Sequence, residues 1–291
     1  MIYTAEAHQV ALEFGSQIVP HTRFNSVLKS IESAVDIGNA AGIYAGVRVS
    51  APSGSGKSVL LEHVGNRLNA VYGGNGNIAM ISASLKENPS VSQVQSELIE
   101  NFNYPARSVS RLGNNNDVNV VLVKAITQHR VQLIAIDEFQ HVFLTGGLKV
   151  ATPVIDWLKR LMNLSHVPVL LLGTESIDRL EGLDPQLTSR IPTVGRLGHF
   201  PLNGEWYGFV KALAGACKGM DMSALCKDVS LSASLHGATK GSPRLTKALL
   251  VHSICIGLTN GQKVLDRSIL KEAYVVLRGG EPNLENPFAD T

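Results

Sequence analysis

A glycine-rich segment that ends in Gly-Lys-Ser carries the clearest chemical signal in this sequence. It follows the apolar run Ile43–Val49 and precedes the helix-like run Val59–Val64, so the pattern is a strand, a loop and a helix. Unpaired backbone N–H groups in such a loop, together with the helix dipole, attract anionic oxygens. The pattern predicts a nucleotide-phosphate site in which Lys57 contacts the β- and γ-phosphates and the Ser58 hydroxyl contacts Mg²⁺. The expected loop residues are Ser53, Gly54, Ser55, Gly56, Lys57, Ser58 and Val59.

The first position of this loop departs from the usual pattern, because Ala51 stands where glycine is common. The methyl group of Ala51 is compatible with the loop only if the backbone φ of this residue is negative. The alternative interpretation is a glycine-rich turn that contains Lys-Ser by chance. The flanking strand and helix patterns favour the phosphate site over that alternative.

Two adjacent carboxylates, Asp137 and Glu138, follow the continuous apolar run Val131–Ile136. Such a run is typical of a strand buried on both faces of a parallel sheet, and ligands bind at the carboxyl ends of such strands. We therefore expect Asp137 to hold Mg²⁺ together with Ser58, and Glu138 to polarise an attacking water as a general base. The alternative is an exposed acidic pair that begins a loop, and the Gly-Lys-Ser segment makes it the weaker one.

A further apolar run, Val167–Leu172, leads into Gly173 and Thr174, and we expect its strand to lie beside the strand that ends at Asp137. In that position Thr174 could hydrogen-bond the attacking water or the γ-phosphate. It could equally cap the following helix Glu175–Leu180, since threonine is a common N-cap residue. Position alone does not separate the two interpretations.

Two arginines are candidates for contact with phosphate. Arg190 ends a helical segment before the last predicted strand, where ring-forming ATPases place an arginine that reaches a neighbouring subunit's γ-phosphate. Its alternative role is a favourable cation at a helix C-terminus. Arg244 begins a helix after Gly241-Ser242-Pro243, an electrostatically unfavourable place for a cation unless an anion lies nearby. Its alternative is an ordinary surface arginine.

Composition is that of an ordinary globular protein. The chain has 291 residues, of which 17% are charged and 44% hydrophobic, and the net charge of +2 does not by itself indicate a nucleic-acid partner. The nine histidines form no ligand cluster, and the three cysteines lack metal-ligand spacing, so we expect no metal beyond Mg²⁺. We find no secretion signal and no apolar run of about 20 residues that could span a bilayer, so we expect a cytoplasmic protein without a membrane partner.

Strand and helix patterns alternate up to Phe200 and then become entirely helical. This order predicts an α/β fold, with a five-stranded parallel sheet flanked by helices and a small helical domain behind it. We expect an N-terminal helical segment at 1–42, an α/β domain at 43–202, a helical domain at 203–278 and a flexible acidic tail at 279–291. The predicted strands are Val47–Ser50, Ile78–Ala83, Leu133–Asp137, Val167–Thr174 and Val194–Phe200.

Taken in order, these motifs resemble those of the AAA+ ATPases, and within them the TniB/TnsC transposition helpers, which are related to phage MuB. The resemblance covers roughly residues 15 to 260. It implies that the α/β part is an AAA+ P-loop domain and the helical part its lid. The matching segments are Val19–Arg23, Ser53–Ser58, Ile136–His141, Leu172–Thr174, Asp184–Arg190 and Gly241–Arg244.

The resemblance also implies roles for individual residues. Thr174 would be the first sensor, Arg190 a finger that acts in trans and Arg244 the second sensor, while Val19 would line the adenine pocket. The cofactors would be ATP and Mg²⁺, and the enzyme would hydrolyse ATP.

The family further implies partners. The chain would form rings or helical filaments on duplex DNA in the bacterial cytoplasm, recruit a transposase, respond to a target-selector protein and disassemble on hydrolysis. Such filaments hold the phosphate backbone largely without reading bases, so isolated basic residues suffice. The tail around Phe288 could dock a partner or be an extended end. The DNA-contact candidates are Lys86, Arg107, Arg111 and Lys149.

Three other functions compete with an ATPase regulator of transposition. A replication initiator or helicase loader shares the fold but usually carries an added DNA-binding domain, for which few residues remain after about 278. A P-loop small-molecule kinase leaves Arg190 and the helical domain unexplained. A non-catalytic nucleotide-gated scaffold leaves Glu138 without a purpose.

Overall fold

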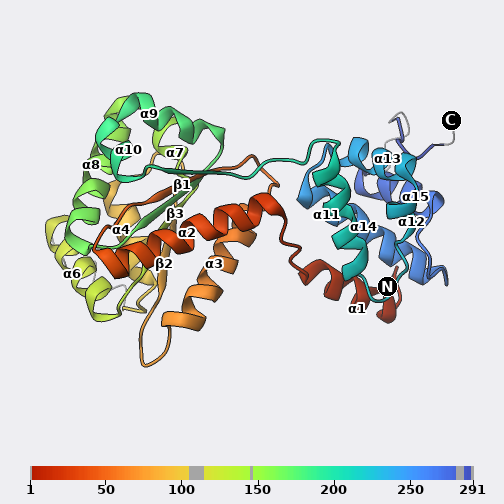
Figure 1. Ribbon diagram of the computed structural model, residues 1–291, viewed down its shortest axis with the longest axis horizontal. Coiled ribbons are helices and arrows are strands. Elements are labelled where there is room, and N and C mark those ends of the chain that lie inside the picture. The colour runs from red at the N-terminus through yellow and green to blue at the C-terminus, as the bar shows by residue number, and fades with distance from the viewer. Residues whose placement is uncertain (1, 105–114, 145–146, 280–284, 290–291) are drawn as a thin grey trace. The chain divides into compact units, whose positions relative to one another are not determined.

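The computed structural model describes residues 2–104, 115–144, 147–279 and 285–289 (Figure 1). The chain divides into an α/β unit, Arg23–Ser53 with Lys57–Leu197, and a helical unit that contains Met1–Thr22, Gly54–Gly56 and Gly198–Thr291. The N-terminal segment expected at 1–42 is therefore shared between the units. In the described ranges, no helix has the length and apolar character needed to cross a membrane.

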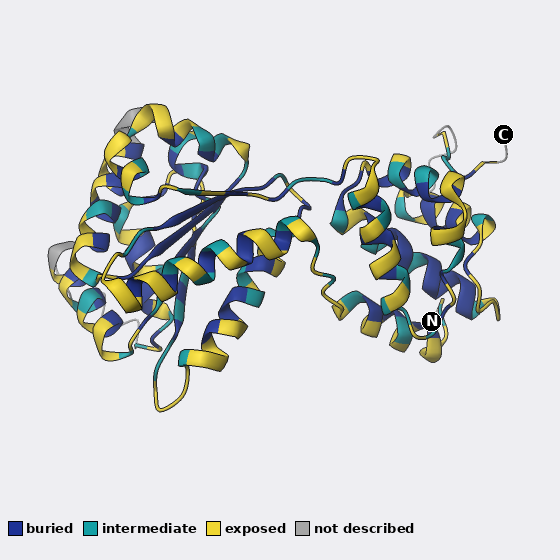
Figure 2. Cartoon of the chain, in the orientation of Figure 1, coloured by how far each residue is buried: buried dark blue, intermediate teal, exposed yellow. Residues whose placement is uncertain are grey.

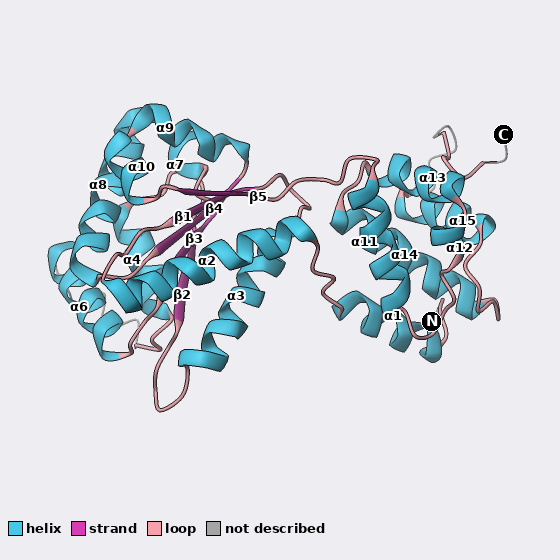
Figure 3. Ribbon diagram, viewed as in Figure 1, coloured by secondary structure: helices cyan, strands magenta, loops and turns pink. Residues whose placement is uncertain are grey.

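The α/β unit is built on a five-stranded sheet in the order β2-β3-β4-β1-β5. Every strand pair is parallel, which confirms the predicted fold class. Strand β4 lies between β1 and β3, as expected for the strand that leads to Thr174, so the carboxyl ends of these three strands are neighbours. Figure 3 shows the strands in magenta among the helices of this unit. The strands are β1 (Val47–Ser50), β2 (Met80–Ser84), β3 (Leu133–Asp137), β4 (Val169–Gly173) and β5 (Thr193–Arg196).

Both faces of the central strands β1, β3 and β4 are buried, which explains why β3 and β4 are continuous apolar runs. Successive residues of β3 point to opposite sides: Ile134 and Ile136 join one hydrophobic cluster, whereas Leu133 and Ala135 join the other. Helices α4, α6 and α8 supply the first cluster, and helices α2 and α3 supply the second. The central strands are accordingly mostly dark blue in Figure 2.

Helix ends in this unit follow local capping chemistry. Helix α4 begins after Ser90, which forms a reciprocal capping box with Gln93, and α10 begins after Asp184, with proline at its first position. Helix α8 runs through Pro153, which lies inside the helix rather than at its start. The helices are α2 (Thr22–Ala41), α3 (Lys57–Tyr72), α4 (Val91–Glu100), α6 (Asn115–Gln128), α7 (His141–Leu144), α8 (Gly147–Ser165), the 3-10 helix η1 (Glu175–Arg179), α9 (Leu180–Leu183) and α10 (Pro185–Arg190).

The helical unit has its own hydrophobic core. Trp206 is fully buried there, and its indole N–H donates to the Ser232 carbonyl oxygen over 3.1 Å, so the one polar atom of the ring is satisfied. Phe14 of α1 joins this core, which ties the N-terminal helix to this unit. The helices are α1 (Ala5–Ser16), α11 (Gly204–Ala216), α12 (Ala224–Lys227), α13 (Val229–Thr239), α14 (Pro243–Thr259) and α15 (Arg267–Leu277).

The end of the chain differs from the extended tail that composition suggested. Phe288 has no exposed surface and lies in the helical core, with its ring centroid 6.2 Å from that of Tyr274. Asn286 fixes the approach, because its side-chain amide donates to the Lys271 carbonyl oxygen over 3.0 Å. At Phe288 both alternatives, a docking aromatic and an extended end, are therefore wrong, since the ring is already packed inside its own unit.

Candidate nucleotide site

The phosphate loop has the backbone geometry that its glycines allow. Gly54 and Gly56 have φ values of +80° and +99°, which side-chain-bearing residues rarely adopt, and α3 begins directly after them at Lys57. A Cβ atom added to Gly56 would meet no atom within 4 Å, so the backbone there faces open space. Open amides at a helix N-terminus fit the anionic oxygens of a nucleotide.

Ala51 is accommodated without strain. The residue is fully buried, and it is not among the residues with positive φ, so its methyl group meets the condition set by the sequence. Its N–H donates to the Gly173 carbonyl oxygen over 2.9 Å, which ties the start of the loop to the end of β4.

Lys57 and Glu138 meet at the carboxyl edge of the sheet. The Lys57 Nζ atom lies 3.1 Å from Glu138 Oε1, and the lysine side chain is only 10% exposed. Glu138 has a φ of +54°, a left-handed conformation that costs a non-glycine residue about 1 kcal/mol or more. The Asp137 carboxylate accepts the Glu138 N–H over 2.7 Å, which stabilises this turn. The two strongest sequence motifs therefore converge on one site.

The two adjacent carboxylates have opposite pKa shifts. Burial raises the pKa of Asp137 above its ordinary value, the neighbouring Glu138 charge adds to this, and the Glu138 N–H and Lys57 oppose it. Burial also acts to raise the pKa of Glu138, but hydrogen bonds from Gln140 and Lys57 outweigh it and the net shift is downward. Glu138 is thus kept as a carboxylate, which is the form that a general base requires.

The metal ligands predicted from the sequence are of a type that suits Mg²⁺. Ser58 is exposed in the first turn of α3, and the partly buried carboxyl group of Asp137 ends β3. Mg²⁺ is usually held by one or two protein oxygens with substrate phosphates and water, so a hydroxyl and a carboxylate fit its chemistry. Within the described ranges, no group of three or more His, Cys, Asp or Glu residues could hold a metal ion.

Thr174 follows β4 and precedes η1, so it lies one strand away from Glu138 in the sheet order. Thr174 occupies the N-cap position of η1, but its hydroxyl makes no capping hydrogen bond there. Its backbone N–H instead donates to the side-chain oxygen of Gln140 over 3.0 Å. The Gln140 amide nitrogen in turn donates to Glu138 Oε2. Sequence reasoning did not select Gln140, although it lies two residues after the predicted base.

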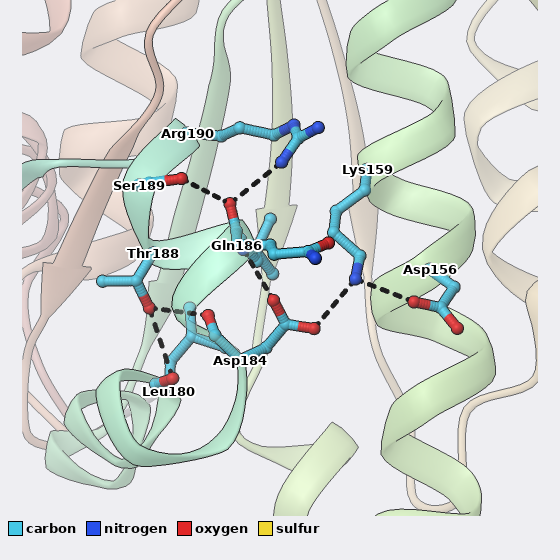
Figure 4. Close-up of polar contacts among 9 residues, drawn as sticks. Asp156, Lys159, Leu180, Asp184, Gln186, Thr188, Ser189 and Arg190 are labelled. Carbon is cyan, nitrogen blue, oxygen red and sulfur yellow. Dashed lines mark hydrogen bonds and ion pairs between the residues drawn. The ribbon is translucent and has the colours of Figure 1, made fainter.

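Arg190 ends α10, as predicted, and lies in a compact polar network (Figure 4). Its guanidinium donates to the Gln186 carbonyl oxygen over 3.1 Å, a contact of the kind expected for a cation at a helix C-terminus. At the other end of α10, Asp184 caps the helix and pairs with Lys159 of α8 over 2.9 Å. The side chain of Arg190 is half-buried, and its role toward a second subunit stays a prediction.

The remaining nucleotide candidates are Arg244, Val19 and Val59. Arg244 is in the first turn of α14, after the capping residue Ser242, and Val19 packs against the core of the helical unit. Val59 is 39% exposed in the first turn of α3. The roles of all three toward nucleotide stay predictions.

Of the four DNA-contact candidates, only Lys86 has a described side chain. Lys86 is exposed just after β2. Arg107 and Arg111 lie outside the described residues, and Lys149 lies in α8 with a side chain that is not described.

Comparison with known proteins identifies the family. The family described as Bacterial TniB protein matches residues 14–196, which is more than half of the chain and includes the Gly-Lys-Ser loop and the Asp137-Glu138 pair. The chain belongs to the TniB family. This agrees with the resemblance of the sequence motifs of this TniB protein to those of the transposition helpers. No curated protein sequence matches it at a significant level.

Solved structures similar to this TniB protein share its AAA+ fold. The ADP form of the Aeropyrum pernix ORC2 protein has a TM-score of 0.68 at 16% identity, and the match covers 89% of this chain and 70% of that one. The Aeropyrum pernix ORC1 protein in complex with DNA has a TM-score of 0.64 at 16% identity, with coverages of 89% and 66%. Domain III of the Thermotoga maritima replication initiation protein DnaA has a TM-score of 0.55 at 16% identity, with coverages of 91% and 94%.

Proposed function

We propose that this TniB protein is an ATP-hydrolysing regulator of DNA transposition that assembles on duplex DNA and is released by hydrolysis. The observation that carries the ATPase proposal is the meeting of Lys57 and Glu138, with 3.1 Å between Nζ and Oε1 at the N-terminus of α3. The transposition role is supported by the family match, which spans both residues.

In this proposal each part of the α/β unit has a defined task. The loop amides and Lys57 bind the phosphates, and Val59 lies in the same first turn of α3 as Lys57. Glu138 accepts the proton of the attacking water, and Thr174 at the neighbouring strand end orients that water. Ser58 and Asp137 hold Mg²⁺, which would supply positive charge to the phosphate oxygens.

Residues outside this cluster would make the site depend on assembly. Arg190, at the end of α10, reaches the γ-phosphate of a neighbouring subunit and stabilises the charge that develops there. Arg244 acts as the second sensor, and Val19 contributes to the adenine pocket. Lys86, Arg107, Arg111 and Lys149 remain the candidates for contact with DNA phosphates. A transposase and a target-selector protein are the proposed protein partners.

The family match favours this role over a replication initiator or helicase loader, which shares the fold. The AAA+ architecture lends no support to a small-molecule kinase.

Two substitutions test the proposal by separating assembly from hydrolysis. Lys57→Ala removes the phosphate-binding cation and should prevent ATP-dependent binding to DNA. Glu138→Gln keeps the site but removes the base, so ATP hydrolysis should slow and the DNA-bound state should last longer. The measurements are the rate of phosphate release and the dissociation rate from labelled duplex DNA.

Exposed residues of the same unit provide matched controls. Lys124→Ala on α6 and Glu62→Gln on α3 make the same chemical changes at exposed positions and should behave like the wild type. Identical effects of Lys57→Ala and Glu138→Gln on both measurements would contradict the separate roles.

A further inference from the structure

Gln140 is the buried link between two residues of the proposed site. Gln140 is only 4% exposed and lies in the short turn between β3 and α7. The amide nitrogen donates to Glu138 Oε2, and the amide oxygen accepts the Thr174 backbone N–H over 3.0 Å. One side chain thus connects the carboxylate that follows β3 with the backbone that follows β4.

The chemistry of the two contacts requires an amide. The partner at one end is a carboxylate, which only accepts, so the side chain must donate there. The partner at the other end is a backbone N–H, so the side chain must accept. A carboxylate in place of Gln140 would keep the acceptor but lose the donor, and an aliphatic side chain would lose both.

The neighbouring backbone is shaped for this side chain. A Cβ atom added to Gly173 would lie 2.8 Å from Gln140 Oε1, closer than real Cβ contacts come. Glycine at the last position of β4 therefore leaves the space in which the Gln140 amide lies beside the Thr174 N–H. This requirement is independent of the hydrogen bonds that define the link.

The Glu138 carboxylate is held from two sides. Lys57 contacts Oε1 and Gln140 contacts Oε2, while the Glu138 backbone has the unfavourable φ of +54°. Lys57 also has the phosphates as proposed partners, whereas Gln140 has none in the proposed mechanism. Gln140 can therefore keep its hydrogen bond to the Glu138 carboxylate when Lys57 binds phosphate.

We infer that Gln140 is a positioning residue for ATP hydrolysis, which aims Glu138 and fixes it relative to Thr174 through a single buried amide. This inference rests on the proposed function, in which Glu138 is the general base. Partners that orient metal-binding side chains typically contribute about 10- to 100-fold to activity, and we expect the same range for a partner that orients the Glu138 carboxylate.

The first test is Gln140→Glu in the full-length protein, assayed for ATP turnover with Mg²⁺ and duplex DNA. The variant keeps the shape and the acceptor for the Thr174 N–H but loses the donor to Glu138. The kcat should fall about 10- to 100-fold with an unchanged KM for ATP. In the Glu138→Gln background the same substitution should have no further effect, because its target is gone. Gln128→Glu, at an exposed position of α6, is the matched control and should match the wild type.

A second variant reaches the same link without changing Gln140. Gly173→Ala should displace the amide oxygen, lower kcat in the same range and accelerate hydrogen exchange of the Thr174 backbone N–H. Gln140→Glu should leave that exchange slow, since its carboxylate still accepts. The exchange measurement does not depend on hydrolysis.

The outcomes separate the two proposals. Absence of ATP hydrolysis by the wild type would count against the proposed function. Hydrolysis by the wild type with an unchanged kcat for both variants, or an equal loss for Gln140→Glu in the Glu138→Gln background, would overturn the positioning role of Gln140 alone.

Discussion

The Asp184 side chain should control how firmly α10, and with it Arg190, is held. Its Oδ1 atom accepts the Leu187 N–H over 2.7 Å, and its Oδ2 atom lies 2.9 Å from Lys159 Nζ (Figure 4). Loss of an aspartate N-cap costs about 0.5–2 kcal/mol, and a partly exposed ion pair adds up to about 1 kcal/mol. Asp184→Ala should therefore destabilise the folded form of α10 by about 2 kcal/mol.

The asparagine variant separates the two contributions. Asp184→Asn keeps an oxygen that can accept the Leu187 N–H but loses the charge that pairs with Lys159, so its cost should be about 1 kcal/mol or less. Asp156→Asn is the matched control, because Asp156 is 59% exposed and Lys159 keeps its contact with Asp184. This control should change stability by less than about 0.5 kcal/mol.

Hydrogen exchange of the α10 amides measures this local stability directly. A loss of about 2 kcal/mol corresponds to exchange roughly 30-fold faster, and about 1 kcal/mol to roughly 5-fold faster. The Ile191 N–H, which donates to the Leu187 carbonyl oxygen over 3.1 Å, is a suitable reporter. Exchange at the wild-type rate in Asp184→Ala, or equal rates in the alanine and asparagine variants, would refute the capping argument.

Three further predictions concern the same unit and the end of the chain. Burial acts to raise the pKa of Asp184, but hydrogen bonds from Lys159 and the Leu187 N–H outweigh it, so the folded-state pKa is lowered. The stability that the Asp184 carboxylate contributes is therefore complete above about pH 3.9 and is lost as the pH falls through the folded-state pKa. Asp184→Asn should lose less stability in acid denaturation than the wild type, and identical acid profiles would contradict this. Ala51→Gly should lower stability by about 0.5–1 kcal/mol without improving ATP affinity, as measured by denaturation and nucleotide titration, and tighter ATP binding would show that the methyl group is a defect. Phe288→Ala should cost about 3 kcal/mol or more, because the ring is fully buried, and an unchanged melting temperature would contradict its place in the core.

The strand that ends at Asp137 could be predicted well because the sequence carries two separate signals for it. The run Leu133–Asp137 is apolar where both faces are covered and turns acidic where the strand ends, so its position and its orientation toward the site follow from the sequence. The pairing of β4 with β3 was also predictable, since both strands end in polar residues expected at one site. The glycines of the loop are likewise consistent with its backbone, since Gly54 and Gly56 both have positive φ.

Other features depend on contacts that sequence patterns do not contain. The end of the chain is polar and acidic, yet Phe288 is buried because the helical unit offers a place for its ring. Arg48 lies in β1 with only 3% exposure and pairs with Glu181, far away in the sequence. The role of Gln140 depends on the fold in the same way, because one of its two partners, the Thr174 N–H, lies 34 residues away at the end of the neighbouring strand.

Electron microscopy of the protein with ATP, Mg²⁺ and duplex DNA tests the central claim most directly. If ATP binding drives assembly, the wild type and Glu138→Gln should form rings or filaments on DNA, and Lys57→Ala should form none. Single, unassembled molecules of the wild type under these conditions would contradict the proposal that ATP binding drives the assembly of this TniB protein on DNA.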